Sequence, residues 1–470
     1  MTKKPMNFRT ALIAAAASAF LAGCSLIPTY ERPVAPVPTT FPGDPAQPVG
    51  AAAATVPWQD FFADERLQLL INTALANNRD LRVSVLNIEQ ARAQFQISRA
   101  SQFPAINGIF TGTRQPSIVN GQLGNTFQVG LGITAWEIDF FGRLDSLKQQ
   151  ALAQYLGTEE ARKSAQISLI SAVANGWYTL LADDELLELT RQTLATRDDS
   201  VKLTKLRFDN GASSEIDFQL ANSLAETARA SYAQQRRQRL QDENALALLL
   251  GAPLPPSVMT TAGGTSPLDS VKGMPELPVG LPSDLLTERP DIRQAEQTLI
   301  GANANTGAAR AAFFPRITLT AQAGTVSNEL SGLFKSGTTA FTLAPQLSLP
   351  IFNAGANQAN LESARAGREI AVAQYEKSIQ SAFREVADAL AGRETLGEQL
   401  RAQRAQAEAE GVRFKLSDLR YRNGIASALD LLDSQRSLFS AQQLAVQARL
   451  LQLQNQVVLY KALGGGWTAR

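Results

Sequence analysis

The stretch Leu419-Arg-Tyr-Arg-Asn-Gly-Ile-Ala-Ser-Ala-Leu-Asp-Leu-Leu-Asp-Ser-Gln-Arg-Ser-Leu438 has a diverged copy earlier in the chain, which reads Leu206-Arg-Phe-Asp-Asn-Gly-Ala-Ser-Ser-Glu-Ile-Asp-Phe-Gln-Leu220. Both copies place an Asn-Gly pair and then an aspartate at matching positions, 213 residues apart. Glycine adopts positive φ without a steric penalty, and Asn-Gly followed by small polar residues interrupts a long helical pattern. Each copy is therefore predicted to form the tip of a helical hairpin.

The duplication extends well beyond these two tips. Arg99-Ala-Ser-Gln-Phe-Pro-Ala-Ile106 resembles Arg310-Ala-Ala-Phe-Phe-Pro-Arg-Ile317, at an offset of 211 residues. Residues 65–250 and 285–463 are thus copies, and each copy should contain the same order of elements.

The composition excludes several kinds of chemistry. The 470-residue chain has a net charge of +1, which gives no reason to expect a nucleic-acid partner. It contains no His and one Cys, so imidazole catalysis, a Cys-His pair, a zinc site and an intrachain disulfide are excluded. With no nucleophile motif and no Gly-rich phosphate loop either, the sequence predicts neither an enzyme nor a cofactor or metal site.

The N-terminus has the pattern of a secretory signal. A basic start precedes the apolar run Ala11 to Ala22, which is too short to span a bilayer, and the run closes with Leu21-Ala-Gly-Cys24. This ending resembles the bacterial lipobox, which implies cleavage after residue 23, lipid attachment to Cys24 and, with Ser25 next, sorting to the outer membrane. An ordinary signal peptide with an unrelated cysteine is the alternative. The Pro- and Ala-rich segment that follows is predicted to be an extended tether lying on other parts of the protein.

Long helices are predicted where proline is absent, because proline in a helix interior costs about 3 kcal/mol. The first such gap admits one helix over Arg143–Phe208, about 100 Å long at the helical rise per residue. Apolar residues recur in it at the coiled-coil spacing of seven, at Leu180, Leu187, Leu194, Val201 and Phe208.

Shorter helices complete each copy. The predicted return arms are Ile216–Leu250 and Leu429–Leu463, and the helices that open the copies are Leu67–Ser101 and Leu285–Ala312. The residues at the coiled-coil positions of these helices are small or aliphatic, and the other residues are mostly polar. The helices therefore form either ordinary coiled coils or a helical wall with water on one side.

Four segments alternate between apolar and polar residues and are predicted to be strands: Phe103–Thr113, Phe127–Ala135, Ile317–Ala323 and Phe341–Leu349. Strands of about ten residues with one apolar side are typical of transmembrane β-barrels. Four strands cannot close a barrel, and unpaired edges are not tolerated in lipid, so several chains must pool their strands. Two soluble hairpins with a one-sided core are the alternative.

The order of lipobox, helix, hairpin, long helices with an Asn-Gly tip, and a second copy resembles the outer-membrane factors of TolC and OprM type. The most specific pieces are Arg420-Tyr-Arg-Asn-Gly424, Leu431-Leu-Asp-Ser-Gln-Arg-Ser-Leu438 and the ending Leu459-Tyr-Lys-Ala-Leu-Gly-Gly-Gly-Trp467. The ending resembles the lipoprotein branch that serves drug-efflux pumps of the resistance-nodulation-division type.

The resemblance implies an α+β membrane protein. Three identical chains would form a 12-stranded transmembrane β-barrel, four strands per chain, continuous with a long periplasmic α-helical barrel. The implied partners are the other two chains of the homotrimer, outer-membrane lipid, a periplasmic adaptor protein and an inner-membrane efflux pump. An equatorial belt would come from Trp58–Asp64, the Pro-rich link Pro253–Pro290 and the C-terminal end.

The chain is accordingly divided into a signal peptide (1–23), a lipid-anchored tether (24–62), a first structural repeat (63–252), a Pro-rich equatorial linker (253–284), a second repeat (285–463) and a C-terminal tail (464–470).

Two aspartates at the second tip are candidates for a gate. Asp430 and Asp433 are three residues apart on one helix and share a face. In a trimer, six such carboxylates around one axis would repel one another and attract cations. Solvated surface aspartates are the alternative from the sequence alone, whereas the resemblance implies an acidic constriction at the periplasmic entrance.

The resemblance also implies a lock on the gate. Asp217 and Tyr421 match the Asp and Tyr that hold neighbouring helix pairs together in the closed family member, but Ala426 stands where that member has a lock arginine. Arg436 could pair with Asp433 at the mouth or form an ordinary surface pair.

The turns themselves are the candidate adaptor contact, because small exposed residues suit the packing of an adaptor hairpin, although any tight helical turn would carry similar residues. They are Gly211, Ala212, Ser213, Gly424, Ile425, Ala426 and Ser427.

The predicted function is an outer-membrane channel of a tripartite efflux system, lipid-anchored and extending into the periplasm. It would be a passive exit duct for drugs or other small molecules. The alternatives are a duct for type I protein secretion or metal-ion export, and an envelope-spanning structural lipoprotein built on coiled coils. The four alternating strands favour a duct, because a scaffold has no use for them.

Overall fold

The computed structural model describes residues 25–42, 53–116, 121–258, 268–278 and 282–467. The predicted signal peptide and Cys24 lie outside the described residues. The chain divides into two compact units, each assembled from separate segments. Of the described residues, the first unit comprises those within 25–34, 87–159 and 294–376, and the second comprises those within 35–86, 160–293 and 377–467.

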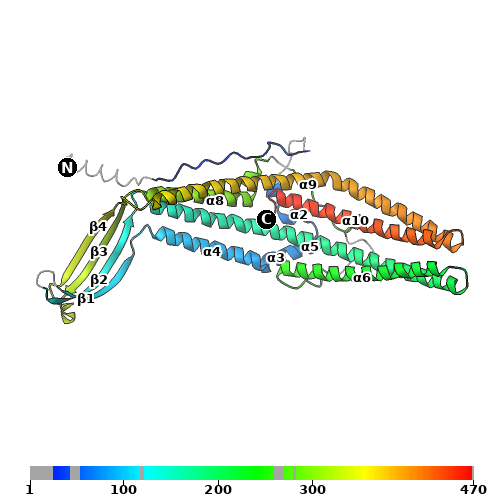
Figure 1. Ribbon diagram of the computed structural model, residues 1–470, viewed down its shortest axis with the longest axis horizontal. Coiled ribbons are helices and arrows are strands. Elements are labelled where there is room, and N and C mark those ends of the chain that lie inside the picture. The colour runs from blue at the N-terminus through cyan, green and yellow to red at the C-terminus, as the bar shows by residue number, and fades with distance from the viewer. Residues whose placement is uncertain (1–24, 43–52, 117–120, 259–267, 279–281, 468–470) are drawn as a thin grey trace, which may run out of the picture. The chain divides into compact units, whose positions relative to one another are not determined.

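The helices follow the predicted duplicated order (Figure 1). Their bounds are α2 Trp58–Phe61, α3 Glu65–Asn77, α4 Arg79–Ala100, α5 Arg143–Asp209, α6 Glu215–Leu250, α7 Leu285–Glu288, α8 Pro290–Ala311, α9 Ala356–Arg422 and α10 Ala428–Ala462, with short 3-10 turns η1 Ala53–Thr55 and η2 Leu330–Gly332. The longest two, α5 and α9, hold corresponding places in the two copies and have 67 residues each. The predicted long helix and both return arms are confirmed to within one residue at each end.

The helices that open the copies are interrupted, contrary to the prediction of one continuous helix each. The first breaks at the extended residue Asn78, whose side-chain oxygen accepts a hydrogen bond from the Leu81 N–H (2.9 Å) and so caps α4. The second breaks at Arg289, because the ring of Pro290 disfavours helical backbone in the residue before it.

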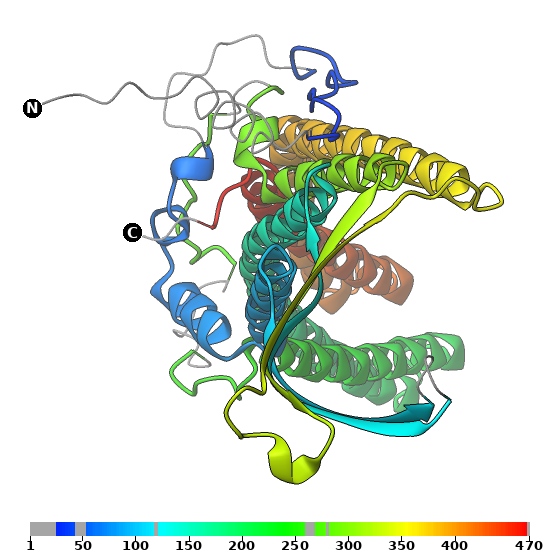
Figure 2. The same ribbon diagram turned by 90° about the vertical axis from the view of Figure 1, so that its left-hand side faces the viewer.

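The first unit contains an antiparallel sheet of four strands in chain order (Figures 1 and 2): β1 Ile106–Pro116, β2 Leu123–Ile138, β3 Arg316–Ser327 and β4 Thr339–Ser348. The four predicted strands are present, although β2 is 16 residues long and extends the predicted segment at both ends. Within the described chain, β1 pairs only with β2 and β4 only with β3, so both outer edges of the sheet are open.

The two copies meet in the middle of this sheet. Gly130 of β2 lies opposite Gly324 of β3. A Cβ atom on Gly130 would lie 2.3 Å from the Ala323 carbonyl oxygen, and one on Gly324 would lie 2.1 Å from that of Val129. Only glycine fits at this crossing.

The described start of the chain, residues 25–34, lies as an extended strap against α8 within the first unit. Glu296 accepts hydrogen bonds from Arg32 Nε (2.7 Å), Arg32 Nη2 (2.9 Å) and the Tyr30 hydroxyl (2.9 Å). Farther along α8, Asn303 donates to the Pro28 carbonyl oxygen (2.7 Å), and a Cβ on Gly307 would lie 2.7 Å from Ile27. This part of the predicted tether is therefore held along the helix by side-chain contacts.

The second unit has an aromatic core beside its helices. Phe61 stacks on Tyr460 with ring centroids 4.1 Å apart, and the Tyr460 hydroxyl donates to the Val56 carbonyl oxygen (2.6 Å). Trp58 and Trp177 are also buried. These contacts join the segment before α3 to the C-terminal end of α10.

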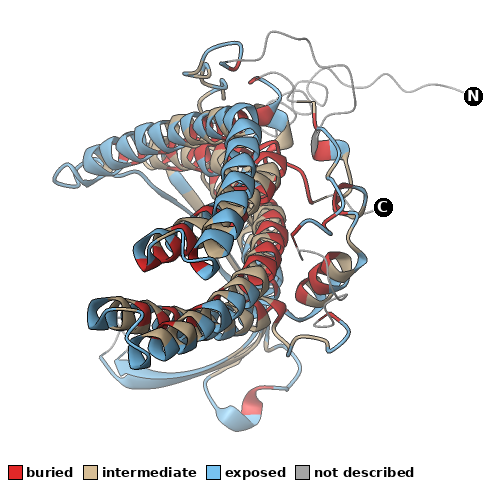
Figure 3. Ribbon diagram, turned by 90° about the vertical axis from the view of Figure 1, so that its right-hand side faces the viewer, coloured by how far each residue is buried: buried red, intermediate tan, exposed pale blue. Residues whose placement is uncertain are grey.

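The residues that α5 buries toward its tip differ from the predicted row of apolar residues. Leu180 is buried, but the row becomes more exposed toward the tip, and Phe208 is 37% exposed. The most buried row is instead polar and also repeats every seven residues: Asp183, Thr190, Arg197 and Thr204. Thr190 and Thr204 donate to carbonyl oxygens of the preceding turn, so they need no partner on another helix. Figure 3 shows buried residues on the sides of the helices that face other helices.

None of the described helices combines the length and the apolarity needed to cross a membrane.

Candidate functional site

The two helical hairpins end in tips with the same local structure, as the sequence predicts (Figure 1). Gly211 and Gly424 have φ of 72° and 74°, which favours glycine. The backbone N–H of Ala212 donates to the Arg207 carbonyl oxygen (2.8 Å), and that of Ile425 donates to the Arg420 carbonyl oxygen (2.9 Å). These bonds satisfy carbonyl groups that a helix end leaves free.

Asp217 and Asp430 begin the return helices as partners in capping boxes. The Asp217 carboxylate accepts a hydrogen bond from the Ser214 hydroxyl (2.8 Å), and the Ser214 oxygen accepts one from the Asp217 N–H (3.1 Å). Ser427 and Asp430 repeat these bonds at the same two distances. The serine hydrogen bonds lower the pKa of both carboxyl groups, so both are ionised at neutral pH.

Asp433 is held by two arginines, in contrast to Asp430. Arg436 Nη2 lies 2.6 Å from one carboxylate oxygen, which is the ion pair considered from the sequence. Arg413 Nη2, on α9, lies 3.2 Å from the other oxygen. The sequence analysis missed Arg413, because its approach depends on how α9 and α10 align along the hairpin.

Tyr421 lies at the junction between the two hairpins. It is 4% exposed and packs with Ala428, Leu431, Leu203 and Phe414. The guanidinium of Arg207, from the other hairpin, lies 4.3 Å from the ring centroid and donates to the Tyr421 carbonyl oxygen (3.2 Å).

The Tyr421 hydroxyl is buried without a hydrogen-bond partner among the described residues. No hydrogen bond joins Tyr421 to Asp217 within this chain; the residue that reaches Tyr421 is Arg207. The sequence analysis missed Arg207, and the available signal was the Leu-Arg pair that opens both copies of the tip sequence.

The residues predicted to contact an adaptor lie on the turns. Gly211, Ala212, Gly424 and Ser427 are exposed, Ser213 and Ala426 are half-buried, and Ile425 is 69% exposed. A Cβ on either glycine would meet no atom within 4 Å, so conformation rather than space requires glycine there.

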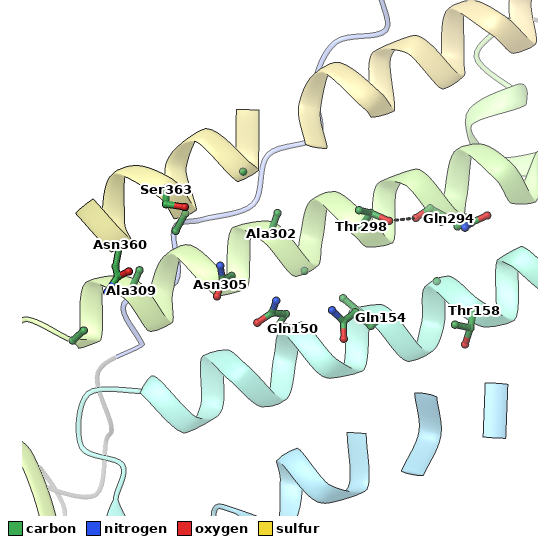
Figure 4. Close-up of a pocket in the computed structure, with 16 residues that line it drawn as sticks. Gln150, Gln154, Thr158, Gln294, Thr298, Ala302, Asn305, Ala309, Asn360 and Ser363 are labelled. Atoms are coloured by element: carbon green, nitrogen blue, oxygen red, sulfur yellow. Dashed lines mark hydrogen bonds between the residues drawn. The ribbon is translucent and has the colours of Figure 1, made fainter. Parts of the chain in front are cut away.

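A cavity of about 850 Å³ lies in the first unit between α5, α8 and α9 (Figure 4). Its lining combines Ala and Gly residues with uncharged polar ones, which include Gln150, Gln154, Asn305, Asn360 and Ser363. No titratable residue lines it, so it offers no group for acid-base chemistry. Among the described residues, no group of three His, Cys, Asp or Glu could hold a metal ion.

A sheet with two open edges and tips built from caps and turns suit a membrane channel better than an enzyme. Comparison with known proteins establishes this class. The chain belongs to the outer membrane efflux protein family, whose model matches residues 70–252 and 281–465.

Relatives match along nearly the whole chain. The probable efflux pump outer membrane protein TtgC of Pseudomonas putida KT2440 is 47% identical over 97% of this chain and 96% of its own length. The outer membrane protein OprJ of Pseudomonas aeruginosa PAO1 is 44% identical over 95% of this chain and 94% of its own length.

Solved structures of membrane channels also match this chain along most of its length. The open-state MtrE outer membrane channel of Neisseria gonorrhoeae is 41% identical with a TM-score of 0.85, over 94% of this chain and 99% of MtrE. CusC is 37% identical with a TM-score of 0.82, over 94% of this chain and all of CusC. These neighbours are membrane channels, and this chain has the same fold with its own four-stranded sheet, so the predicted family and fold class are confirmed.

The predicted function and location are also confirmed by these relatives. The protein is an outer-membrane channel of a tripartite efflux system, and it extends into the periplasm. The relatives are channel proteins rather than enzymes.

Proposed function

We propose that the protein is a passive exit duct formed by three identical chains, without catalysis by any of them. The observation that carries this proposal is the sheet of four strands whose outer edges are open in the single chain. Unpaired backbone groups in lipid cost several kcal/mol each, so β1 of one chain must pair with β4 of the next. Three chains supply twelve strands, which is within the range of closed membrane barrels.

The exposed apolar side chains of the sheet support this arrangement. Phe110, Leu131, Phe341, Leu343 and Leu347 are each more than 60% exposed in the single chain. Side chains of this kind on barrel strands are stabilised by lipid. We further propose that Cys24 carries a lipid anchor, which the strap on α8 would hold next to the first unit.

The tips form the proposed periplasmic gate. Asp430 and Asp433 from three chains would give six carboxylates around one axis, and such a ring attracts cations. Arg413 and Arg436 form ion pairs with Asp433 within each chain, whereas Asp430 is hydrogen-bonded to Ser427 and has Arg420 only as a more distant cation. Asp430 is therefore the stronger source of negative potential at the mouth.

We propose that a periplasmic adaptor packs on the turns at Gly211–Ser213 and Gly424–Ser427, and that an inner-membrane pump delivers the cargo. The chain's matched relatives include proteins named for toluene efflux and for antibiotic efflux in Pseudomonas putida. We place the cargo of this channel in the same class of small molecules.

The experiment that tests the gate is a conductance measurement in planar bilayers. The double variant Asp430→Asn with Asp433→Asn should lower the ratio of cation to anion permeability. The matched control, Asp388→Asn with Glu398→Gln, removes two charges that are about three-quarters exposed on α9 and should leave the ratio unchanged. An equal ratio in the wild type and the tip variant would show that these aspartates do not line the conducting path.

A further inference from the structure

Arg197 of the second unit is a buried cation. It lies on α5, and only 4% of it is exposed. Its Nη1 donates to the Leu224 carbonyl oxygen of α6 (2.8 Å), and its guanidinium lies 5.7 Å from the ring centroid of Phe439 on α10. Its Nε is buried and has no hydrogen-bond partner in the described part of the chain.

No carboxylate of the described residues lies within 4 Å of this guanidinium. The nearest acids in the sequence have other partners: Asp198 pairs with Arg229 (3.1 Å), and Asp199 pairs with Lys202 (2.9 Å). A buried charge without a counter-ion is costly, and arginine does not give up its proton to escape that cost. Burial lowers the pKa of Arg197, in the direction expected for a desolvated cation.

A partly open cavity of about 140 Å³ lies beside Arg197 and is lined by residues of α5, α9 and α10. Its lining is half polar, and it consists of Leu189, Gln192, Thr193, Thr196, Arg197, Phe414, Gln435, Leu438, Phe439 and Gln442. Gln435 is 7% exposed, and its Oε1 is also buried without a partner among the described residues. One water occupies roughly 30 Å³ in the liquid, so the cavity has room for a small polyatomic ion.

The shape of the free edge of Arg197 indicates the kind of ion. Because Nη1 is already bonded to Leu224, the remaining edge is the one formed by Nε and Nη2. Two parallel N–H groups on that edge match two oxygens of an oxyanion, which is the strongest geometry that arginine offers. The Gln435 amide now donates from Nε2 to Ser200 Oγ (3.0 Å), and the Ser200 hydroxyl donates to the Thr196 carbonyl oxygen. If the O and N atoms of the amide are exchanged and the Ser200 hydroxyl turns to donate to Oε1, the NH₂ group faces the cavity.

We propose that this cavity binds a small inorganic oxyanion of the sulfate or phosphate type, held by the Nε and Nη2 edge of Arg197. The site goes beyond the proposed duct function, and it stands whether or not the tips form a gate. The bound ion would connect α5 of the first hairpin to α9 and α10 of the second, because residues of these three helices line the cavity.

The test is calorimetric titration of sodium sulfate into the full-length mature protein in detergent, with chloride used to hold the ionic strength constant. We expect saturable binding by the wild type. Arg197→Gln should weaken it about ten- to a hundredfold, the loss expected for one charge-assisted hydrogen-bonded contact. The matched control is Arg191→Gln, since Arg191 is 59% exposed, lies on the same helix and does not line the cavity.

Two results of the titration would overturn the proposal. One is an absence of saturable sulfate binding by the wild type. The other is equal binding by the wild type and Arg197→Gln, which would mean that sulfate binds elsewhere on the surface. Arg197→Lys keeps the charge but loses the fork, and we expect intermediate affinity.

A second measurement does not depend on the folding of a variant. Wild-type crystals grown with selenate should give an anomalous peak beside Arg197 Nε. An empty cavity, or a carboxylate of a neighbouring chain bonded to that nitrogen, would refute the oxyanion site.

Discussion

Replacing Arg207 by Met should loosen the contact between the two hairpins of one chain. The guanidinium makes two contacts with Tyr421: its stacking on the ring at 4.3 Å and its hydrogen bond to the carbonyl oxygen at 3.2 Å. A partly exposed cation–π contact contributes roughly 0.5 to 2 kcal/mol, and a charged hydrogen bond roughly 1.5 to 3 kcal/mol. Because Met retains some packing and Arg207 is only half-buried, we expect a net loss of about 1 to 3 kcal/mol per chain.

If Tyr421 holds the gate closed, this loss appears directly in the closed-to-open equilibrium. A change of about 1 to 3 kcal/mol per chain corresponds to roughly a 5- to 150-fold shift toward the open state. The assay is single-channel recording, in which the fraction of time spent open is compared between Arg207→Met and the wild type. The control Arg237→Met removes an exposed arginine of α6 and should leave that fraction unchanged.

A double-mutant cycle with Tyr421→Leu isolates the contact itself. The two substitutions remove the same interaction, so their combined effect should be smaller than the sum of the separate effects by about 1 kcal/mol. Unchanged opening in Arg207→Met, or fully additive effects in the cycle, would refute a role for this contact in closing the channel.

Three further predictions concern other parts of the chain. Burial of Asp183 and the nearby carboxyl group of Asp242 raise the pKa of Asp183 to about 7, so the folded state keeps a proton that the unfolded chain loses near pH 4. The stability contributed by this group should fall as pH rises from about 4 to 7. Asp183→Asn should remove that pH dependence, as measured by thermal unfolding between pH 5 and 8. A variant that loses stability relative to the wild type on going from pH 5 to 8 would contradict this. Gly307→Ala should displace the strap by overpacking, at a cost of about 1 to 3 kcal/mol, and should speed proteolysis within residues 25–34. In the control Gly301→Ala, the added methyl group meets its neighbours only at 3.5 Å or more, so proteolysis should not change. Equal cleavage of the two variants would count against the docked strap. Cys24→Ser should leave heat-stable trimers on gels, since strands rather than acyl chains would hold the assembly together, and loss of trimers would contradict that.

The elements that follow from local chemistry were predictable from the sequence. The absence of proline between Pro116 and Pro253 indicated where a helix as long as α5 could form, and Asn-Gly followed by small polar residues identified both tips, because such turn signals act within a few residues. The alternating segments identified the four strands for the same reason. The family resemblance, rather than the residues alone, supplied the roles of Asp217 and Tyr421, and those roles remain predictions.

Contacts between distant segments were not predictable in this way. The buried row of α5 carries Asp183 and Arg197, which a search for apolar heptads passes over. Arg413 and Arg207 reach Asp433 and Tyr421 only because of how the helices align along the hairpins. The break at Asn78 was also missed, since an asparagine within a periodic helical pattern is a weak signal until its side chain is seen to cap the next helix.

The pairing of Gly130 with Gly324 joins a strand from each half of the duplicated gene. A half-length ancestor would have carried one two-stranded hairpin, which is at best marginally stable alone. It would have needed six copies to supply the same number of strands as three present-day chains. Gene fusion would then have halved the number of subunits that must meet in the envelope.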